Sequence, residues 1–358
     1  MLLFCFFVVF MFAINKIYFA NIIYSIIYVK QVIKKNSKLI LVNNSISIWL
    51  CLLFLFYITL NTLIYTIHSG SFDSRNLFQY LFNLQYLLLI LPIKINVNFF
   101  ERWVYLFSIL LAIIIIAIFI TEDTPFAVFS RTNELIKKVP GFPNSVLIPL
   151  IIALWLSFKR AEKTWLKPLL IIAIFLTGSR AGYLAIILIL GYYTFQKIKT
   201  KKIYLFYFTI VLSLCVIWLS NLFLKFPNLV TIISRSYDRL DIFHTTMAYV
   251  ELNPIFGYGG NTIDQLKDVK IDHIPLRDWG HTHNWIMEIL LRYGTIGLAL
   301  FLGFIISIWM NIKERDRKYM FGVLLFIALF QTYIRDFIFL FFLAYIANYQ
   351  TQIISKKN

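Results

Sequence analysis

Several arginines and one histidine of this chain have the side chains needed to bind a diphosphate and to remove a proton. Arg235 and Arg239 are four residues apart, so on a helix they share one face. Arg180 interrupts an otherwise apolar run. Guanidinium groups bind phosphate oxygens through paired donors, and the imidazole of His283 can act as a general base near neutral pH. The set suits attack by an acceptor hydroxyl on a lipid-linked diphosphate.

Each of these residues also has a plainer explanation. The two helical arginines would equally fit a solvated face or contacts to lipid headgroups, and His283 would fit an idle surface position. His281 and His283, with His273 nearby, have a spacing that allows a metal but fixes no third ligand, so we expect no metal. Arg180 is harder to explain without a function, because a charge at membrane depth costs about 2.5–3.5 kcal/mol or more.

The elements that must hold these residues are membrane helices. The chain has 358 residues, of which 60% are hydrophobic, whereas soluble globular domains have about 45–50%. Runs such as 103–120 are long enough to cross the roughly 30 Å hydrocarbon layer. The 34 Lys and Arg outnumber the 17 Asp and Glu, but they fall in short runs between apolar segments. That placement is typical of cytoplasmic loops, so we expect no nucleic-acid partner.

Six basic clusters predict the topology. They lie at residues 30–38, 94–102, 159–167, 197–202, 313–318 and 356–357. If all six are cytoplasmic, an even number of crossings separates each neighbouring pair. The predicted crossings include the apolar runs at 46–67, 77–92, 103–121, 144–158, 203–222 and about 294–310. This predicts an all-α polytopic protein with about 12 transmembrane helices and with both termini in the cytoplasm. The alternative is 11 helices, with residues 2–29 forming a single one.

Two apolar intervals carry charge at their midpoints. Pro168–Phe195 contains Arg180, and the interval 319–352 contains Arg335 and Asp336. One continuous helix over the first interval would span about 42 Å at 1.5 Å per residue, and it would put the flanking basic clusters on opposite sides. We therefore expect each interval to form a hairpin of two short helices with its charged tip facing outward. The Arg-Asp pair would also fit a structural ion pair.

One long hydrophilic stretch, residues 223–284, is predicted to face outward, and loops of this length tend to be functional or disordered. The chain as a whole, 1–358, is predicted to be a single membrane domain. The first part of the loop, 232–252, has apolar residues at helical spacing, with Leu240, Phe243, Met247 and Val250 on one face. A turn containing Asn, Pro and several glycines then ends this predicted helix. After the loop, Trp285–Tyr293 is predicted to form an amphipathic turn with Glu288 and Arg292 at i,i+4.

Three motifs resemble the bacterial O-antigen ligase/polymerase family. Thr177–Gly182 resembles its Ser-Arg-x-Gly helix break. The string from Arg239 to Thr262, which includes Asn-Pro-Ile-Phe-Gly-Tyr-Gly-Gly, resembles its Arg…Asn-Pro-x-x-Gly-x-Gly segment. The string from His283 to Leu298 resembles its His-Asn-x-x-x-Glu…Gly-x-x-Gly-Leu segment. The motifs occur in the family's order and cover roughly residues 165–310, whereas the first 140 residues contribute only hydropathy.

The resemblance implies a GT-C-like fold that transfers a glycan from an undecaprenyl diphosphate carrier, without a metal or another cofactor. It places the protein in the bacterial cytoplasmic (inner) membrane, with the active site facing the periplasm or exterior. By motif, Arg180 and Arg239 would bind the diphosphate, and His283 would activate the acceptor hydroxyl. Arg235 would assist the diphosphate, although it matches no family position. The remaining candidates, with supporting roles, are His281 and Asp336.

Within this family a ligase transfers finished glycan to lipid A-core, whereas a polymerase joins two lipid-linked repeat units. The His-x-His-Asn form and the Arg-Asp pair before the last helix favour the ligase slightly. A flippase or exporter for the same substrates is the alternative from another class, and an assembly scaffold is a third. A transporter would need the arginines near the membrane midplane with access from both sides, whereas a transferase needs them only on the outer side. Membrane lipids are partners in every case.

Overall fold

Helices account for the regular structure in the described part of the chain, which contains no strand. The computed structural model describes residues 45–69, 83–89, 97–121, 144–159, 165–177, 179–196, 242–260, 282, 284–330 and 337–348. Most of the buried apolar side chains in these ranges belong to a single cluster. The prediction of an all-helical fold is therefore confirmed for these ranges, whereas the expected count of about 12 crossings depends on residues outside them.

Two described helices, α3 (Ser45–Ser69) and α14 (Trp285–Asn311), are long and apolar enough to cross a membrane. Helix α3 coincides with the crossing predicted at 46–67. The second part of α14 coincides with the crossing predicted at about 294–310. A run of this length spans the hydrocarbon layer because each helical residue adds about 1.5 Å.

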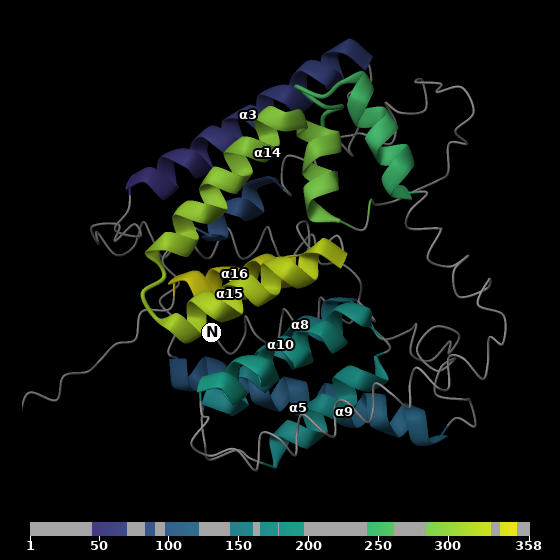
Figure 1. The fold of residues 1–358 in the computed structure, drawn as a ribbon, viewed down its shortest axis with the longest axis vertical. Helices are drawn as coiled ribbons and strands as arrows, with labels where there is room; N and C mark the ends of the chain where they lie inside the picture. The colour runs from purple at the N-terminus through teal and green to yellow at the C-terminus, as the bar shows by residue number, and fades with distance from the viewer. Residues whose placement is uncertain are drawn as a thin grey trace, which may run out of the picture.

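Helices α3 and α14 pack antiparallel along their length (Figure 1). Asn311 Nδ2 donates a hydrogen bond to Ser47 Oγ at 3.0 Å, and the Tyr57 hydroxyl donates to the Tyr293 carbonyl at 2.8 Å. Large apolar side chains on the other face of α3 remain exposed: Trp49, Leu53, Phe56, Ile64 and Ile67. Monomeric soluble proteins rarely expose a contiguous apolar stripe of this kind, whereas a bilayer covers it.

The other described elements are η1 (Leu84–Leu89), α5 (Val97–Thr121), α8 (Asn144–Lys159), α9 (Leu166–Leu176), α10 (Arg180–Gln196), α15 (Arg315–Ile327), η4 (Ala328–Phe330) and α16 (Phe337–Asn348). Helices α5 and α8 fall on the crossings predicted at 103–121 and 144–158. Within the crossing predicted at 77–92, the described residues form mainly the short 3₁₀ helix η1. A helical segment at 242–252 and the turn that follows it complete the description.

Helices α9 and α10 double back on each other. The Lys167 ammonium at the start of α9 lies 4.7 Å from the centre of the Phe158 ring. The same ring stacks on Tyr193 near the end of α10, with 5.2 Å between ring centres. At the other end of the pair, the Tyr183 hydroxyl donates to the Phe175 carbonyl at 2.9 Å. This is the arrangement of the hairpin predicted around Arg180.

Helices α15 and α16 form a second hairpin of the same kind. Arg317 Nε, near the start of α15, donates to the Ile346 carbonyl near the end of α16 at 2.8 Å. The two helices also pack along each other. The predicted tip of this hairpin, with Arg335 and Asp336, lies outside the described residues.

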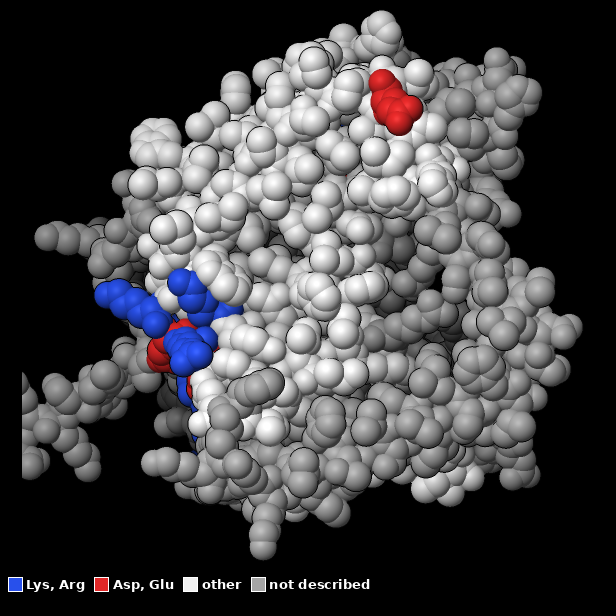
Figure 2. Space-filling view, viewed as in Figure 1, with Lys and Arg blue, Asp and Glu red and all other residues white. Residues whose placement is uncertain are grey.

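Most of the described Lys and Arg residues gather at one end of the helices, whereas Arg292 is buried elsewhere. In Figure 2 the visible Lys and Arg form one patch mixed with acidic residues, while most of the other described surface in that view carries no charge. Lys159 at the end of α8 pairs with Glu314 at 3.1 Å. The hydroxyl of Tyr192, near the end of α10, donates to Asp316 at 2.7 Å. The helix ends that adjoin three of the predicted cytoplasmic clusters therefore meet, as the predicted topology requires.

Candidate functional site

The end of the helices opposite this basic patch brings the motif-bearing helix starts together. Helices α10 and α15 run antiparallel, because the Tyr319 hydroxyl donates to the Leu188 carbonyl at 2.8 Å while the start of α15 meets the end of α10. The indole of Trp285, at the start of α14, donates to the Leu325 carbonyl near the end of α15 at 3.1 Å. The short helix η4, which follows α15, contacts both α10 and α14. The first turns of α10 and α14 therefore lie at one end.

The predicted site residues are only partly visible at this end. Arg180 is the first residue of α10, and the structure describes its backbone but not its side chain. Ser179 just before it is buried, and its hydroxyl has no hydrogen-bond partner in the described structure. The other predicted site residues lie outside the described residues: Arg235, Arg239, His281, His283 and Asp336. Their roles stay predictions, but both chain neighbours of His283 are described.

Helix α14 is broken at Gly294, where φ is 63° and ψ is −167°. In an uninterrupted helix the carbonyl of Leu291 would accept from the Thr295 amide. Here the Leu291 carbonyl instead accepts from the Tyr258 amide at 3.0 Å, and the Thr295 amide donates to the Pro254 carbonyl at 2.8 Å. The backbone groups released by the break are thus satisfied by the glycine-rich turn, as buried polar groups require.

The next pair of backbone groups follows the same pattern. The Gly259 amide donates to the Arg292 carbonyl at 2.7 Å, and the Ile296 amide donates to the Ile255 carbonyl at 3.4 Å. A Cβ atom at Gly257, where φ is 68°, would lie 2.6 Å from the Gly294 nitrogen. Glycine is required there by both the positive φ and the close approach of the two backbones. The Asn253–Gly260 turn and the kink of α14 are therefore complementary.

Helix α3 holds the same turn from its other side. Asn61 Nδ2 donates to the Phe256 carbonyl at 2.7 Å, and the Gly260 amide donates to Thr62 Oγ1 at 3.2 Å. Asn253 closes the turn itself by donating to the Gly257 carbonyl at 2.5 Å. Asn61 and Thr62 are polar residues inside a predicted apolar crossing, and this was the sequence signal for the contact. The sequence did not indicate which backbone groups they would bind.

The helical segment 242–252 packs on the turn through only part of the predicted apolar face, because Val250 is buried there as predicted but Phe243 is not. Phe243 was expected on the apolar face, but its side chain is 41% exposed. Tyr249 and Val250 are buried with Tyr258 and Leu291 in a small separate cluster. The Tyr258 hydroxyl donates to the Tyr249 carbonyl at 2.9 Å, and burial, with smaller contributions from two neighbouring tyrosines, raises its pKa to about 12. Contact with α14, rather than the count of apolar residues, determines which face is buried.

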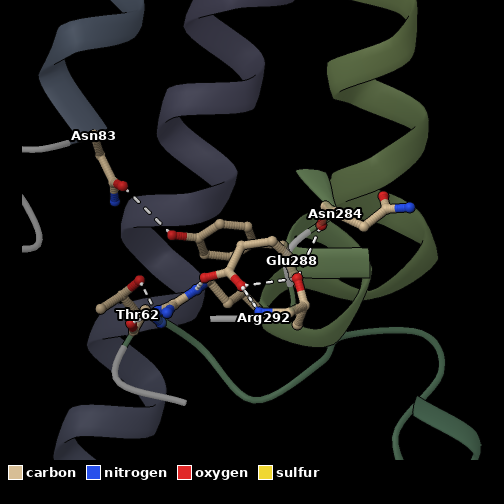
Figure 3. Close-up of polar contacts among 8 residues, drawn as sticks. Thr62, Asn83, Asn284, Glu288 and Arg292 are labelled. Atoms are coloured by element: carbon tan, nitrogen blue, oxygen red, sulfur yellow. Dashed lines mark hydrogen bonds and ion pairs between the residues drawn. The ribbon is translucent and has the colours of Figure 1, made fainter. Parts of the chain in front are cut away.

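A buried polar network surrounds the start of α14 (Figure 3). Arg292 Nε donates to Glu288 Oε1 at 2.5 Å, and Arg292 also donates to the Gly260 carbonyl. Glu288 Oε2 accepts from the Thr282 amide at 3.3 Å and lies 3.1 Å from its hydroxyl. Asn284 caps the helix, because its side-chain oxygen accepts from the two amides that follow Trp285.

The sequence had indicated only an amphipathic turn at this place. The i,i+4 spacing of Glu288 and Arg292 identified them as a pair, but not as a buried one linked to Gly260 and Thr282. Among the described residues no group of three or more His, Cys, Asp or Glu could hold a metal ion. The chemistry of the described network is therefore hydrogen bonding between fixed charges and backbone groups.

Fold and site together define the class: the described ranges are helical, two of the helices are of membrane length, and the starts of α10 and α14 lie at the end opposite a basic patch. A comparison with known families adds an independent finding. Residues 166–302 match the family described as O-antigen ligase. That segment covers less than half of the chain but contains the three motifs, so the resemblance to the O-antigen ligase/polymerase family found in the sequence is confirmed. Comparison with curated proteins and with solved structures gave no match.

Proposed function

We propose that this protein is an O-antigen ligase that transfers a glycan from an undecaprenyl diphosphate carrier to a hydroxyl of lipid A-core. The reaction would take place at the outer side of the bacterial cytoplasmic membrane. The observation that carries the proposal is the family match over residues 166–302, because it contains Arg180, Arg239 and His283 within one segment. A repeat-unit polymerase is the nearest alternative, and it would use the same donor chemistry.

In the proposed step the acceptor oxygen forms a bond to the anomeric carbon of the glycan. The bond from that carbon to the diphosphate oxygen breaks, and His283 takes the proton of the acceptor hydroxyl. Arg180 and Arg239, with Arg235 beside them, bind the diphosphate as negative charge develops on the leaving group. Asp336 and His281 support the site from its margins.

Two features of the described structure support this assignment. The backbone of Arg180 and the first turn of α14, which directly follows His283 and Asn284, lie at the same end of the helices. The buried hydroxyl of Ser179 has no hydrogen-bond partner among the described residues and lies next to Arg180 in the chain. Buried hydroxyls are almost always paired in proteins, so a phosphate oxygen is a suitable partner for this one.

The direct test uses purified protein in liposomes with a lipid-linked glycan and a lipid A-core acceptor. We expect His283→Ala to lower the initial rate of transfer by about 10²-fold or more, the usual contribution of a general base. Arg239→Ala should lower it as well. Transfer at the wild-type rate by His283→Ala would contradict the mechanism. Transport of the lipid-linked glycan without any transfer would contradict the class of activity.

Two further measurements separate the alternatives. A strain that lacks the protein should accumulate polymerised glycan on the carrier lipid if the protein is a ligase. It should accumulate single repeat units if the protein is a polymerase, and that result would replace the proposed acceptor. Since two arginines and a histidine suffice for the proposed step, we expect transfer to continue in the presence of EDTA.

A further inference from the structure

Glu288 and Arg292 form an ion pair that is almost completely buried, with the two residues 2% and 5% exposed. Each end of the pair is bonded to a different part of the chain. One carboxylate oxygen accepts from Arg292, and the other accepts from Thr282. The guanidinium also donates to the carbonyl of Gly260. The pair therefore joins α14, the glycine-rich turn and residue 282.

The need for a stable helix does not explain this arrangement. A buried ion pair contributes little net stability compared with apolar side chains of similar volume. The start of α14 is already capped by Asn284, whose side-chain oxygen accepts from the amides of Ile286 and Met287. Thr282 precedes this cap by two residues. Its bonds to Glu288 consequently fix the chain that enters the helix, and not the helix itself.

We propose that Glu288 and Arg292 are positioning residues that hold His283 for the transfer reaction through Thr282. The inference rests on the proposed function, in which His283 is the base. His283 is the single residue between Thr282 and Asn284, both of which are anchored. Consecutive Cα atoms lie about 3.8 Å apart across a trans peptide. When both neighbours are held, the connectivity of the chain limits how far a residue between them can move.

The same pair couples the base to the arginine-bearing part of the site. Arg292 donates to Gly260, the last residue of the turn that packs on the segment 242–252. That segment begins three residues after Arg239 in the sequence. A displacement of the ion pair would thus shift the base relative to the groups proposed to bind the diphosphate. Misplacement of a catalytic group by about 1 Å can lower a rate by about 10²-fold.

The most informative variants change Thr282, because they leave the buried charges paired. Thr282→Val removes the hydroxyl but keeps the shape of the side chain and the amide bond to Glu288. Thr282→Ser restores the hydroxyl without the methyl group. For Thr282→Val we expect kcat to fall about 10-fold while KM for the lipid-linked glycan stays within twofold of wild type. Thr282→Ser should return kcat to within about threefold of wild type.

Glu288→Gln gives a second, stronger test. The amide replaces one of the two acceptor oxygens with an NH2 donor, so it cannot accept from Arg292 and Thr282 at both positions, and we expect kcat to fall about 10- to 100-fold in the folded protein. Glu314→Gln is the matched control, because Glu314 also forms an ion pair, with Lys159 at 3.1 Å, but at the opposite end of the helices. It should leave kcat and KM unchanged. Rates are normalised to the monodisperse fraction on size exclusion, so a loss of folding does not count as a loss of activity.

The outcomes separate this inference from the proposed function. If His283→Ala is inactive while Thr282→Val retains wild-type kcat, the positioning role is wrong and the base remains. An effect of Thr282→Val on KM alone would also overturn the positioning role. If His283→Ala transfers glycan as well as wild type, the proposed mechanism with His283 as the base fails and the inference fails with it, and if the wild-type protein transfers no glycan, the proposed function itself fails. Should Glu288→Gln not fold, the comparison of the two Thr282 variants still decides the question.

Discussion

Gly294→Ala is the sharpest test of how the glycine-rich turn fits the kink of α14. Gly294 has φ 63° and ψ −167°, a conformation that is essentially restricted to glycine. A Cβ atom at this position would lie 2.6 Å from the Phe256 nitrogen and closer still to the Ile255 carbonyl. Both obstacles are backbone atoms, so no side-chain rotation can relieve the overlap.

The expected loss of stability has two parts. The backbone conformation costs a non-glycine residue about 1–3 kcal/mol. The overlap also pushes the turn away from α14, where four backbone hydrogen bonds join Pro254, Ile255, Tyr258 and Gly259 to the kink. Each such bond contributes about 0.5–1.5 kcal/mol. If two of the four are lost, the free energy of unfolding falls by about 2–6 kcal/mol in total.

The assay is thermal unfolding in detergent, followed by size exclusion and by tryptophan fluorescence. At about 2 °C per kcal/mol for a chain of this size, Gly294→Ala should melt about 4–12 °C below wild type. Gly303→Ala is the matched control in the same helix. A Cβ atom there would lie 3.9 Å from the nearest atoms, on Leu50. The alanine also favours the helix by up to about 1 kcal/mol, so this variant should melt at or slightly above wild type.

The reasoning would be refuted if Gly294→Ala melted within 1–2 °C of wild type, an interval well below the roughly 4 °C minimum derived from the backbone strain and the lost bonds. An equal fall for Gly303→Ala would also refute it, because that result would reflect a general intolerance of α14 to added methyl groups. Transfer activity should fall together with stability in Gly294→Ala, since the turn and the start of α14 belong to one site.

Three further predictions test other contacts. Asn284→Ala removes the helix cap and should lower stability by about 0.5–2 kcal/mol, whereas Asn284→Asp, which keeps the acceptor, should melt close to wild type. Arg317→Met removes a charged donor from the Ile346 carbonyl, worth about 1.5–3 kcal/mol, and should accelerate amide hydrogen exchange near the end of α16. A cysteine replacing Lys270 should react with an impermeant thiol reagent added to intact cells, whereas one replacing Thr200 should not; the reverse pattern would contradict the predicted topology.

Much of the helix pattern follows from the sequence alone, because bilayer-length apolar runs have few other uses. The crossings predicted at 46–67, 103–121 and 144–158 coincide with α3, α5 and α8. The charge in the middle of Pro168–Phe195 was enough to predict a hairpin, since a single helix would bury Arg180 and separate the basic clusters. These conclusions depend on local composition and on charge, which are both properties of short segments.

The sequence was less informative about which faces and which backbone groups meet. Helical spacing placed Phe243 and Val250 on the buried face, but the segment buries Val250 together with Tyr249 against α14 and leaves Phe243 exposed. The contact between the glycine-rich turn and Gly294 involves backbone atoms. Backbone amides and carbonyls are the same in every residue, so no side-chain pattern reveals their long-range partners.

The candidate site was likewise predicted from the sequence only in part. By itself the sequence determined the residue types that suit the chemistry, namely arginines and a histidine in three ordered motifs, and those motifs were sufficient to recognise the family. Only the tertiary structure decided that Glu288 and Arg292 are buried, and that their bonds run to Thr282 and Gly260. The physical reason is that the hydrogen-bond partners of a buried ion pair depend on which segments surround it. Residues 260, 282 and 288 come together only when the chain folds.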